Sequence, residues 1–177
     1  VGRASRARGL LAAAAMATGF AMGGAAWSRA PEPGPVALRR TTDGIPHIRA
    51  DSWRGLGIGQ GYAQAQDALC TLAEAFVTFG GRRSYYFGAA GRPEALSTFG
   101  RPTNLESDFF FQAFADAEAV EAFRREQPAA LNALVDGYAE GFNRYVRGLA
   151  EARPGARGPG CRGGPWGQAI RSGDIYR

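Results

Sequence analysis

A run of alternating glycines leading into an amphipathic segment constrains the fold of this chain more than any other feature. Residues 55–81 read GLGIGQGYAQAQDALCTLAEAFVTFGG, with glycine at positions 55, 57, 59 and 61. This spacing differs from the GxGxxG of dinucleotide-binding folds, and no acidic residue follows at the distance that those folds require, which disfavours a phosphate cradle. Because glycine lacks a side chain, two backbones can approach each other closely where it occurs. The run therefore predicts tight packing against a neighbouring element.

An amphipathic helix is expected after these glycines, ending at Gly80-Gly81. Its apolar positions recur mostly at intervals of three or four residues, which places them on one face of the helix. Asp67 lies near the expected entry of this helix, where a carboxylate interacts favourably with the helix N-terminus. The apolar face consists of Leu69, Leu72, Ala73, Phe76 and Phe79.

Two short strands are expected before the glycines. Val36 and Leu38 alternate with less apolar residues, as in a half-buried strand. The sequence TDG at residues 42–44 is typical of a turn, and residues 45–48 form a second apolar stretch. Pro46 fits the start of a strand or an edge position. The simplest assembly of these segments is a β-hairpin.

His47, the single histidine of the chain, lies in the second expected strand. A catalytic histidine of a triad needs a nucleophile within hydrogen-bond reach and an orienting carboxylate. The sequence contains neither a GxSxG elbow nor an HExxH zinc motif. We therefore interpret His47 as a hydrogen-bonded structural residue and expect no metal and no cofactor. No complete catalytic constellation is evident.

Residues 82–111 are rich in aromatic side chains but carry the glycines and prolines of a loop. Large aromatic groups are unfavourable in water, so they either pack beneath the loop or wall a pocket. The usual behaviour of aromatic clusters favours packing in the core. The side chains concerned are Tyr85, Tyr86, Phe87, Phe99, Phe109, Phe110 and Phe111.

Helical spacing dominates the last third of the chain. Residues 116–127 predict a short helix, and Pro128 suits the first turn of a second helix over residues 131–149. We expect these two helices to form a helical hairpin. Residues 172–177 indicate the opening turn of another helix, with Ser172 as its N-cap.

The N-terminal residues are typical of a targeting segment. Arginines precede an apolar run over residues 10–26, which ends in small residues that suit a cleavage site. The run is short for a membrane span, which needs about 20 apolar residues. We expect a signal peptide at residues 1–30, a proline-rich spacer at residues 31–35, and export to the periplasm or the cell exterior. A retained anchor or a misread start are the alternatives.

The net charge of +5 says little about partners. All 21 basic residues are arginine, and from residue 31 onward 17 arginines stand against 16 acidic residues. No basic stripe remains that could follow a phosphate backbone, so nucleic-acid binding is not expected.

Cys70 and Cys161 are the two cysteines of the chain. An oxidising compartment would favour a disulfide between them, and a loop of that size would contribute roughly 4–5 kcal/mol in the chain-entropy model. Two independent buried thiols are the alternative. Zinc binding is disfavoured because no CxxC or second ligand cluster is present.

Several motifs occur together in a characteristic order over residues 36–177. They are TTDGIPHIRADSWRGLGIGQGYAQAQDALCTLAE, RRSYYFG, FGRPTNLESDFFF, GYAEGFNRYV and C…PWGQAIRSGDIYR. The set closely resembles the N-terminal region of the penicillin acylase family, and more narrowly its aculeacin A acylase and acyl-homoserine-lactone acylase branch.

The resemblance implies an exported N-terminal-nucleophile hydrolase whose precursor cuts itself into an α-chain and a β-chain. The fold class would be α+β: a mainly helical α-chain portion of a four-layer αββα hydrolase, contributing one or two strands to its sheet. The nucleophile would be the serine that begins the β-chain, with its own α-amino group as base. The reaction would release a fatty acid and an amine from a small-molecule acyl amide.

No catalytic residue carries over to this sequence, because the family's catalytic groups belong to the β-chain. His47 matches a non-catalytic position, and Cys70 and Cys161 match two cysteines of the branch, which implies the disulfide. In relatives the α-chain runs on past the segment matching residues 174–176. Residues 36–177 are therefore expected to be an incomplete α-chain, inactive alone, from a truncated gene, a frameshift or a partial record.

Two other interpretations stay open. The chain could be an exported non-catalytic helical module that binds a hydrophobic ligand or a partner, or an inactive gene product. The substrate and its acyl-chain length are not encoded in any motif of this sequence.

Overall fold

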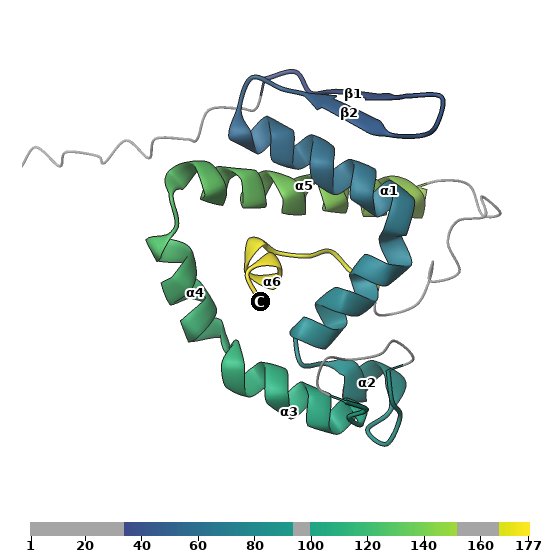
Figure 1. Cartoon of the computed structure of the whole chain (residues 1–177), viewed down its shortest axis with the longest axis vertical. Helices are drawn as coiled ribbons and strands as arrows, with labels where there is room; N and C mark the ends of the chain where they lie inside the picture. Colours follow the sequence, from purple (N-terminus) through teal and green to yellow (C-terminus); the bar gives the residue numbers. More distant parts are fainter. Residues whose placement is uncertain (1–33, 94–99, 152–166) are drawn as a thin grey trace, which may run out of the picture. The chain divides into compact units, whose positions relative to one another are not determined.

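The computed structural model describes residues 34–93, 100–151 and 167–177, which belong to one compact unit, Glu32–Arg177. These residues are mainly helical and carry a two-stranded antiparallel sheet, which confirms the expected class (Figure 1). The predicted signal peptide at residues 1–30 lies outside the described residues. Within the described part, no helix combines the length and the hydrophobicity needed to cross a bilayer.

The β-hairpin forms where the sequence predicts it. Strand β1 (Ala37–Arg40) pairs antiparallel with β2 (Pro46–Arg49), and Arg39 stands opposite His47. The turn between them places Gly44 at φ +82°, a conformation that favours glycine. Arg40 ties the hairpin to the following helix through an ion pair with Asp67 at 2.8 Å.

The long helix α1 (Trp53–Phe79) begins earlier than the sequence predicts, because the alternating glycines lie inside it. Its N-cap is Ser52, whose hydroxyl accepts a hydrogen bond from the Gly55 N–H. Each glycine inside a helix costs about 1 kcal/mol relative to alanine, so tertiary packing must outweigh this propensity. The backbone departs from helical angles at Ala68, where α1 kinks. Asp67 thus lies within the helix and not at its entry.

The glycines of α1 lie on two opposite faces of the helix, and each face packs against a different neighbour. One face meets helix α5 (Ala129–Glu151), which lies alongside the first half of α1 (Figure 1). A methyl group added at Gly57 or Gly61 would lie 2.0 or 2.1 Å from a backbone carbonyl oxygen of α5. Gly137 and Gly141 of α5 would meet carbonyl oxygens of α1 equally closely, at 2.0 Å. The predicted close packing is therefore confirmed, and the neighbouring element is α5.

The other face of α1 meets the hairpin. A methyl group added at Gly59 would lie 2.4 Å from the Ile48 side chain, and one at Gly55 would lie 2.8 Å from the Ala50 side chain. Residues two apart on a helix point in nearly opposite directions, so alternate glycines serve alternate neighbours. The hairpin and α5 thus sandwich the first half of α1.

The core lies where the second half of α1 meets α5. Phe142 is completely buried there, and its ring meets that of Phe76 edge-on at 5.5 Å between centroids. The buried cluster consists of Ala65, Leu69, Ala139, Phe142 and Ile170.

The region predicted as a loop contains two helices, α2 (Arg83–Phe87) and α3 (Asn104–Phe114). The N-terminus of α3 has a capping box, in which Thr103 and Glu106 each bond the other's backbone N–H. The loop prediction was wrong for residues 83–87 and for residues 104–111. In the second segment the glycines and prolines precede the cap and do not interrupt the helix. Phe99 lies outside the described residues.

The helical hairpin predicted for the last third is also wrong. Helix α4 (Ala117–Glu126) starts at the N-cap Asp116 and ends before Pro128, as expected, but α5 packs along α1 and α4 turns away from it (Figure 1). The glycines of α5 lie opposite those of α1, so these two helices pack together. Helix α4 presents no face of this kind to α5. The short helix α6 (Ser172–Ile175) has Arg171 as its N-cap, one residue before the predicted Ser172.

Candidate functional site

The structure brings together no catalytic set among the residues singled out from the sequence. His47 is exposed on β2, and the part of the chain that is described supplies no hydrogen bond to its ring, so the expected hydrogen-bonded role is not seen. Cys70 is half-buried on α1, and Cys161 lies outside the described residues, so the proposed disulfide stays a prediction. The described residues contain no cluster of three potential metal ligands.

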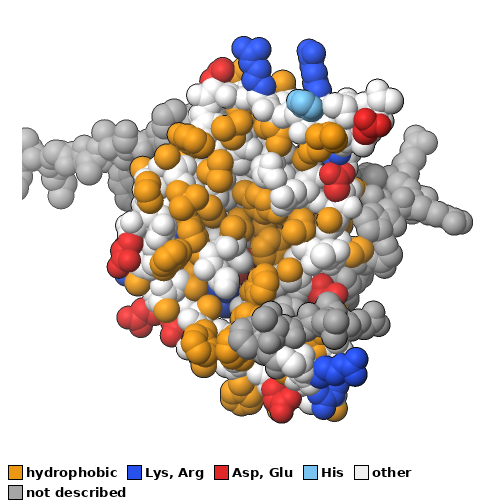
Figure 2. All heavy atoms as spheres, in the orientation of Figure 1, with side chains coloured by type: hydrophobic (Ala, Val, Ile, Leu, Met, Phe, Trp, Pro, Cys, Tyr) orange, Lys and Arg blue, Asp and Glu red, His pale blue; other side chains and the backbone are white. Residues whose placement is uncertain are grey.

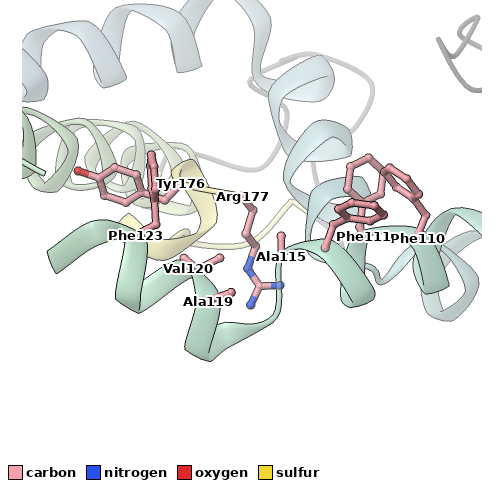
Figure 3. Close-up of a pocket in the computed structure, with 9 residues that line it drawn as sticks. Phe110, Phe111, Ala115, Ala119, Val120, Phe123, Tyr176 and Arg177 are labelled. Atoms are coloured by element: carbon pink, nitrogen blue, oxygen red, sulfur yellow. The ribbon is translucent and has the colours of Figure 1, made fainter. Parts of the chain in front are cut away.

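An open apolar pocket of about 410 Å³ lies between α3, α4 and α6 (Figure 3). Phe123 of α4 and Tyr176, just after α6, form one end, with ring centroids 6.0 Å apart at 73°. Phe110 and Phe111 of α3 form the other end, and the Arg177 side chain extends between the two ends. The remaining lining residues are Phe114, Ala115, Ala119 and Val120. Such walls suit an apolar ligand or an apolar protein segment.

Four of the aromatic side chains of the predicted loop lie either at the surface or in the pocket. Tyr85 is 84% exposed and Phe109 is 71% exposed, so the prediction that they pack in the core was wrong. Phe110 and Phe111 are half-buried and wall the pocket, which was the alternative interpretation. On α3, Phe109 points away from the side that carries Phe110 and Phe111, because successive residues point about 100° apart around a helix. Figure 2 shows hydrophobic side chains spread over the centre of this face, where α6 lies.

Hydrogen bonds from α5 hold α6 beside the pocket. The Asn143 amide both donates to the Ile170 carbonyl and accepts from the Ile170 N–H, each at 2.8 Å. The Ser172 hydroxyl donates to the Asp136 carboxylate, and the Tyr176 hydroxyl donates to Asn132 Oδ1 at 2.8 Å. Burial raises the pKa of Tyr176 above its ordinary value.

A buried polar cluster holds α3 against α1 and α2. Arg83 is 4% exposed, and its guanidinium donates to Asn104 Oδ1 at 2.8 Å and to Glu74 Oε1 at 2.9 Å. The buried Asp108 carboxylate accepts two backbone N–H bonds at the start of α2, from Arg83 and Ser84, each at 2.7 Å. A charge this deeply buried is tolerated only when it is paired and hydrogen-bonded. The cluster therefore fixes where α3 presents Phe110 and Phe111.

A sequence model of the family described as Penicillin amidase matches residues 35–166. The chain belongs to the penicillin amidase family. It is 47% identical over 140 residues to an acyl-homoserine lactone acylase PvdQ of Pseudomonas fluorescens (strain Pf0-1), which covers 79% of this chain and 17% of the relative. It is 34% identical over 146 residues to the aculeacin-A acylase of Actinoplanes utahensis, again covering 79% of this chain and 17% of the relative. This penicillin amidase family chain thus spans less than a fifth of these relatives' length.

A solved structure, a thermostable penicillin G acylase from Alcaligenes faecalis, matches with a TM-score of 0.64 and 23% identity. The match covers 80% of this chain and 68% of that chain. At this identity the likeness shows a shared fold. The family resemblance and the fold class expected from the motifs are confirmed.

The sequence alone did not reveal the polar residues that position the pocket in this member of the penicillin amidase family. Asp136, Asn132 and Asn143 belong to α5, and their spacing in sequence resembles an ordinary polar helix face. Arg83 and Asp108 lie 25 positions apart, with only the RRSYYFG and NLESD motifs as a signal. The pairing of these motifs appears only once α2 and α3 are folded against each other.

Proposed function

We propose that residues 36–177 are the N-terminal α-chain portion of an exported acylase that hydrolyses the amide bond of acylated amines. The observation that carries this proposal is the family match over residues 35–166, together with 47% identity to an acyl-homoserine lactone acylase. The substrate class would be a lipopeptide, an acyl-homoserine lactone or a β-lactam side-chain amide. The whole enzyme would have the four-layer αββα architecture.

In this proposal the chemistry belongs to a β-chain serine that is not among the 177 residues. The serine Oγ attacks the amide carbon while the free α-amino group takes its proton, and the substrate amine leaves with a proton. Water then attacks the resulting ester, releasing the fatty acid and restoring the serine. Residues 1–177 alone would therefore not hydrolyse amides, and the partner would be the β-chain of the same precursor.

The contribution of this chain would be a frame and an apolar wall. The glycine contacts between α1 and α5 give a rigid base, and the pocket between α3, α4 and α6 offers apolar surface suited to an acyl chain. Residues 1–30 would act as a signal peptide and residues 31–35 as a spacer. Export would allow Cys70 and Cys161 to form a disulfide.

Co-expression with the downstream β-chain tests this function. The chain, extended to its natural end, is produced together with the β-chain, and amine release is measured for acyl amides of different length and amine. We expect release from at least one long-chain acyl amide. A DNA sequence downstream that encodes no small residue followed by Ser-Asn would contradict the proposal, as would a purified αβ complex that releases no amine from any of them.

A second candidate is an exported helical module that binds a hydrophobic ligand without catalysis. The open apolar pocket and the strongly exposed Phe109 and Phe114 favour it. In that case the chain alone would be monomeric, would unfold cooperatively and would bind fatty acids without a β-chain. Aggregation of the chain in the absence of a β-chain would count against it.

A further inference from the structure

The register of the β-hairpin decides which backbone groups bond inside it. At the turn, the Thr41 N–H donates to the Ile45 carbonyl oxygen at 3.1 Å. In an antiparallel ladder, pairs that share hydrogen bonds alternate with pairs that share none. Arg39 and His47 form the pair two steps along from the turn, so their backbone groups bond to each other inside the hairpin.

The residues between these pairs point their backbone groups outward, and the two outer edges differ. On β1 these residues are Leu38 and Arg40, and each presents an N–H and a C=O along the edge. On β2 they are Ile48 and Pro46, and proline has no N–H to donate. Among the residues that the structure describes, none bonds to the outward N–H groups of Leu38, Arg40 and Ile48. The edge of β1 can therefore pair with a further strand at both positions, whereas the edge of β2 is interrupted at Pro46.

Helix α1 covers one face of the hairpin, which lies over the first half of this helix (Figure 1). Gly59 faces the Ile48 side chain there, and Arg40 binds Asp67. These strand side chains point towards α1, and their backbone groups point sideways along the edges. The hairpin is thus held through its face, and its edges are the places where another strand can add to the sheet.

We infer that a strand of the β-chain pairs with the outer edge of β1, and that β2 is the edge strand of the resulting sheet. This inference rests on the proposed function, which supplies the β-chain as the partner. The expected architecture places the strands of this chain in a larger sheet, and the chain spans less than a fifth of its relatives' length. Pro46 selects the edge, because it removes a donor from β2 and from no position on β1.

Amide hydrogen exchange of the complete αβ enzyme, measured residue by residue, tests this pairing. Arg39 and His47 are the internal reference, because their amides are protected in any folded hairpin. We expect the amides of Leu38 and Arg40 to exchange at least about a hundredfold more slowly than that of Ile48, which faces the unpaired edge.

Paired substitutions give a second readout, the dissociation constant of the αβ complex. Leu38→Pro removes the outward N–H together with the side chain, and Leu38→Ala removes the side chain alone, so the difference between them isolates the N–H. Ile48→Pro and Ile48→Ala are the matched control, at the opposite position of the same pair. We expect Leu38→Pro to bind the β-chain about tenfold more weakly than Leu38→Ala. The two Ile48 variants should bind it equally well.

Three results would overturn the inference in an αβ complex that releases amine, and would leave the proposed function intact. Fast exchange at Leu38 and Arg40 would show that no strand pairs with β1. Slow exchange at Ile48 would show that β2 is not the edge strand. Equal dissociation constants for Leu38→Pro and Leu38→Ala would show that the β-chain does not bond to this edge. A complex with the expected exchange pattern that cleaves no acyl amide would instead overturn the proposed function alone.

Discussion

Four glycines determine how closely helices α1 and α5 approach each other. Gly57, Gly61, Gly137 and Gly141 each face a carbonyl oxygen of the opposite helix so closely that any Cβ would collide with backbone. Backbone atoms, unlike the ends of flexible side chains, cannot move aside without shifting a whole helix. The helical propensity lost at these positions is therefore recovered through packing.

Gly57→Ala tests this packing directly. The added methyl group would lie 2.0 Å from the Leu134 carbonyl oxygen, so we expect a loss of folding free energy at the upper end of the range for overpacking, about 3 kcal/mol. Gly148→Ala is the control, because nothing lies within 4 Å of a methyl group at that position of α5. The control should stabilise the chain by about 0.5–1 kcal/mol. Urea unfolding measures both changes, and equal effects would contradict the interlocked contact.

The ionisation of Glu140 makes stability depend on pH. Burial raises its pKa, but hydrogen bonds from Arg144 and Arg54 and their charges outweigh this, and the net result is a pKa below the ordinary value. A depressed folded-state pKa stabilises the protein above the unfolded-state pKa, and this contribution is lost as the pH falls through the folded-state value.

Glu140→Gln should remove this contribution. Compared with the wild type, the variant should lose free energy of unfolding at about pH 7, and the difference should shrink as the pH falls towards about 3. Unfolding curves measured across this range provide the check. A difference that stays constant with pH would show that the carboxylate charge does not stabilise the fold.

The position of helix α3 depends on polar contacts with residues 21 to 31 positions earlier in the chain. Its own capping box defines where it starts, but its position relative to α1 comes from Arg83, Asn104 and Asp108. The Gln112 amide adds a bond to the Gly81 carbonyl at the end of α1, at 2.8 Å. The place of α3, and with it one wall of the pocket, is thus fixed by polar contacts in addition to apolar ones.

Asp108→Ala should loosen this element. The change leaves two backbone N–H groups at the start of α2 without their acceptor, and a lost bond to a charged group costs about 1.5–3 kcal/mol. Asp116→Ala, which removes the exposed N-cap of α4, should cost about 1 kcal/mol. Thermal unfolding of the two variants compares them, and a smaller loss for Asp108→Ala would contradict the role of the buried cluster.

Across the whole molecule, the sequence predicted local structure more reliably than it predicted which elements pack against each other. The hairpin at Asp43-Gly44 follows from turn chemistry within a few residues, and the helix over residues 116–127 follows from helical spacing, and both were predicted. The helix that packs against α5 was not predicted, because its identity depends on matching glycine positions 80 residues apart. The pocket was only the alternative interpretation of the aromatic side chains, because its walls come from three separate helices.

The proposed disulfide is a prediction at this scale as well. Exported, unreduced protein should show no reaction with a thiol reagent under denaturing conditions, because Cys70 and Cys161 would be bonded to each other. Reduction should then expose two thiols and lower stability by roughly 4–5 kcal/mol in the chain-entropy model. Two reactive thiols before reduction would show instead that the cysteines are independent.

The glycine contacts between α1 and α5 also limit how this part of the sequence can change in length. Inserting one residue between Gly57 and Gly61 would rotate everything beyond it by about 100° about the helix axis. Gly61 would then turn away from α5, and a residue with a side chain would take its place against the Tyr138 carbonyl oxygen. Substitutions elsewhere on these helices can be absorbed one at a time, but an insertion or deletion within this stretch misaligns both faces of α1 at once. We therefore expect lineages of this chain to vary in length at their loops and to keep a fixed count of residues from Gly55 to Gly61.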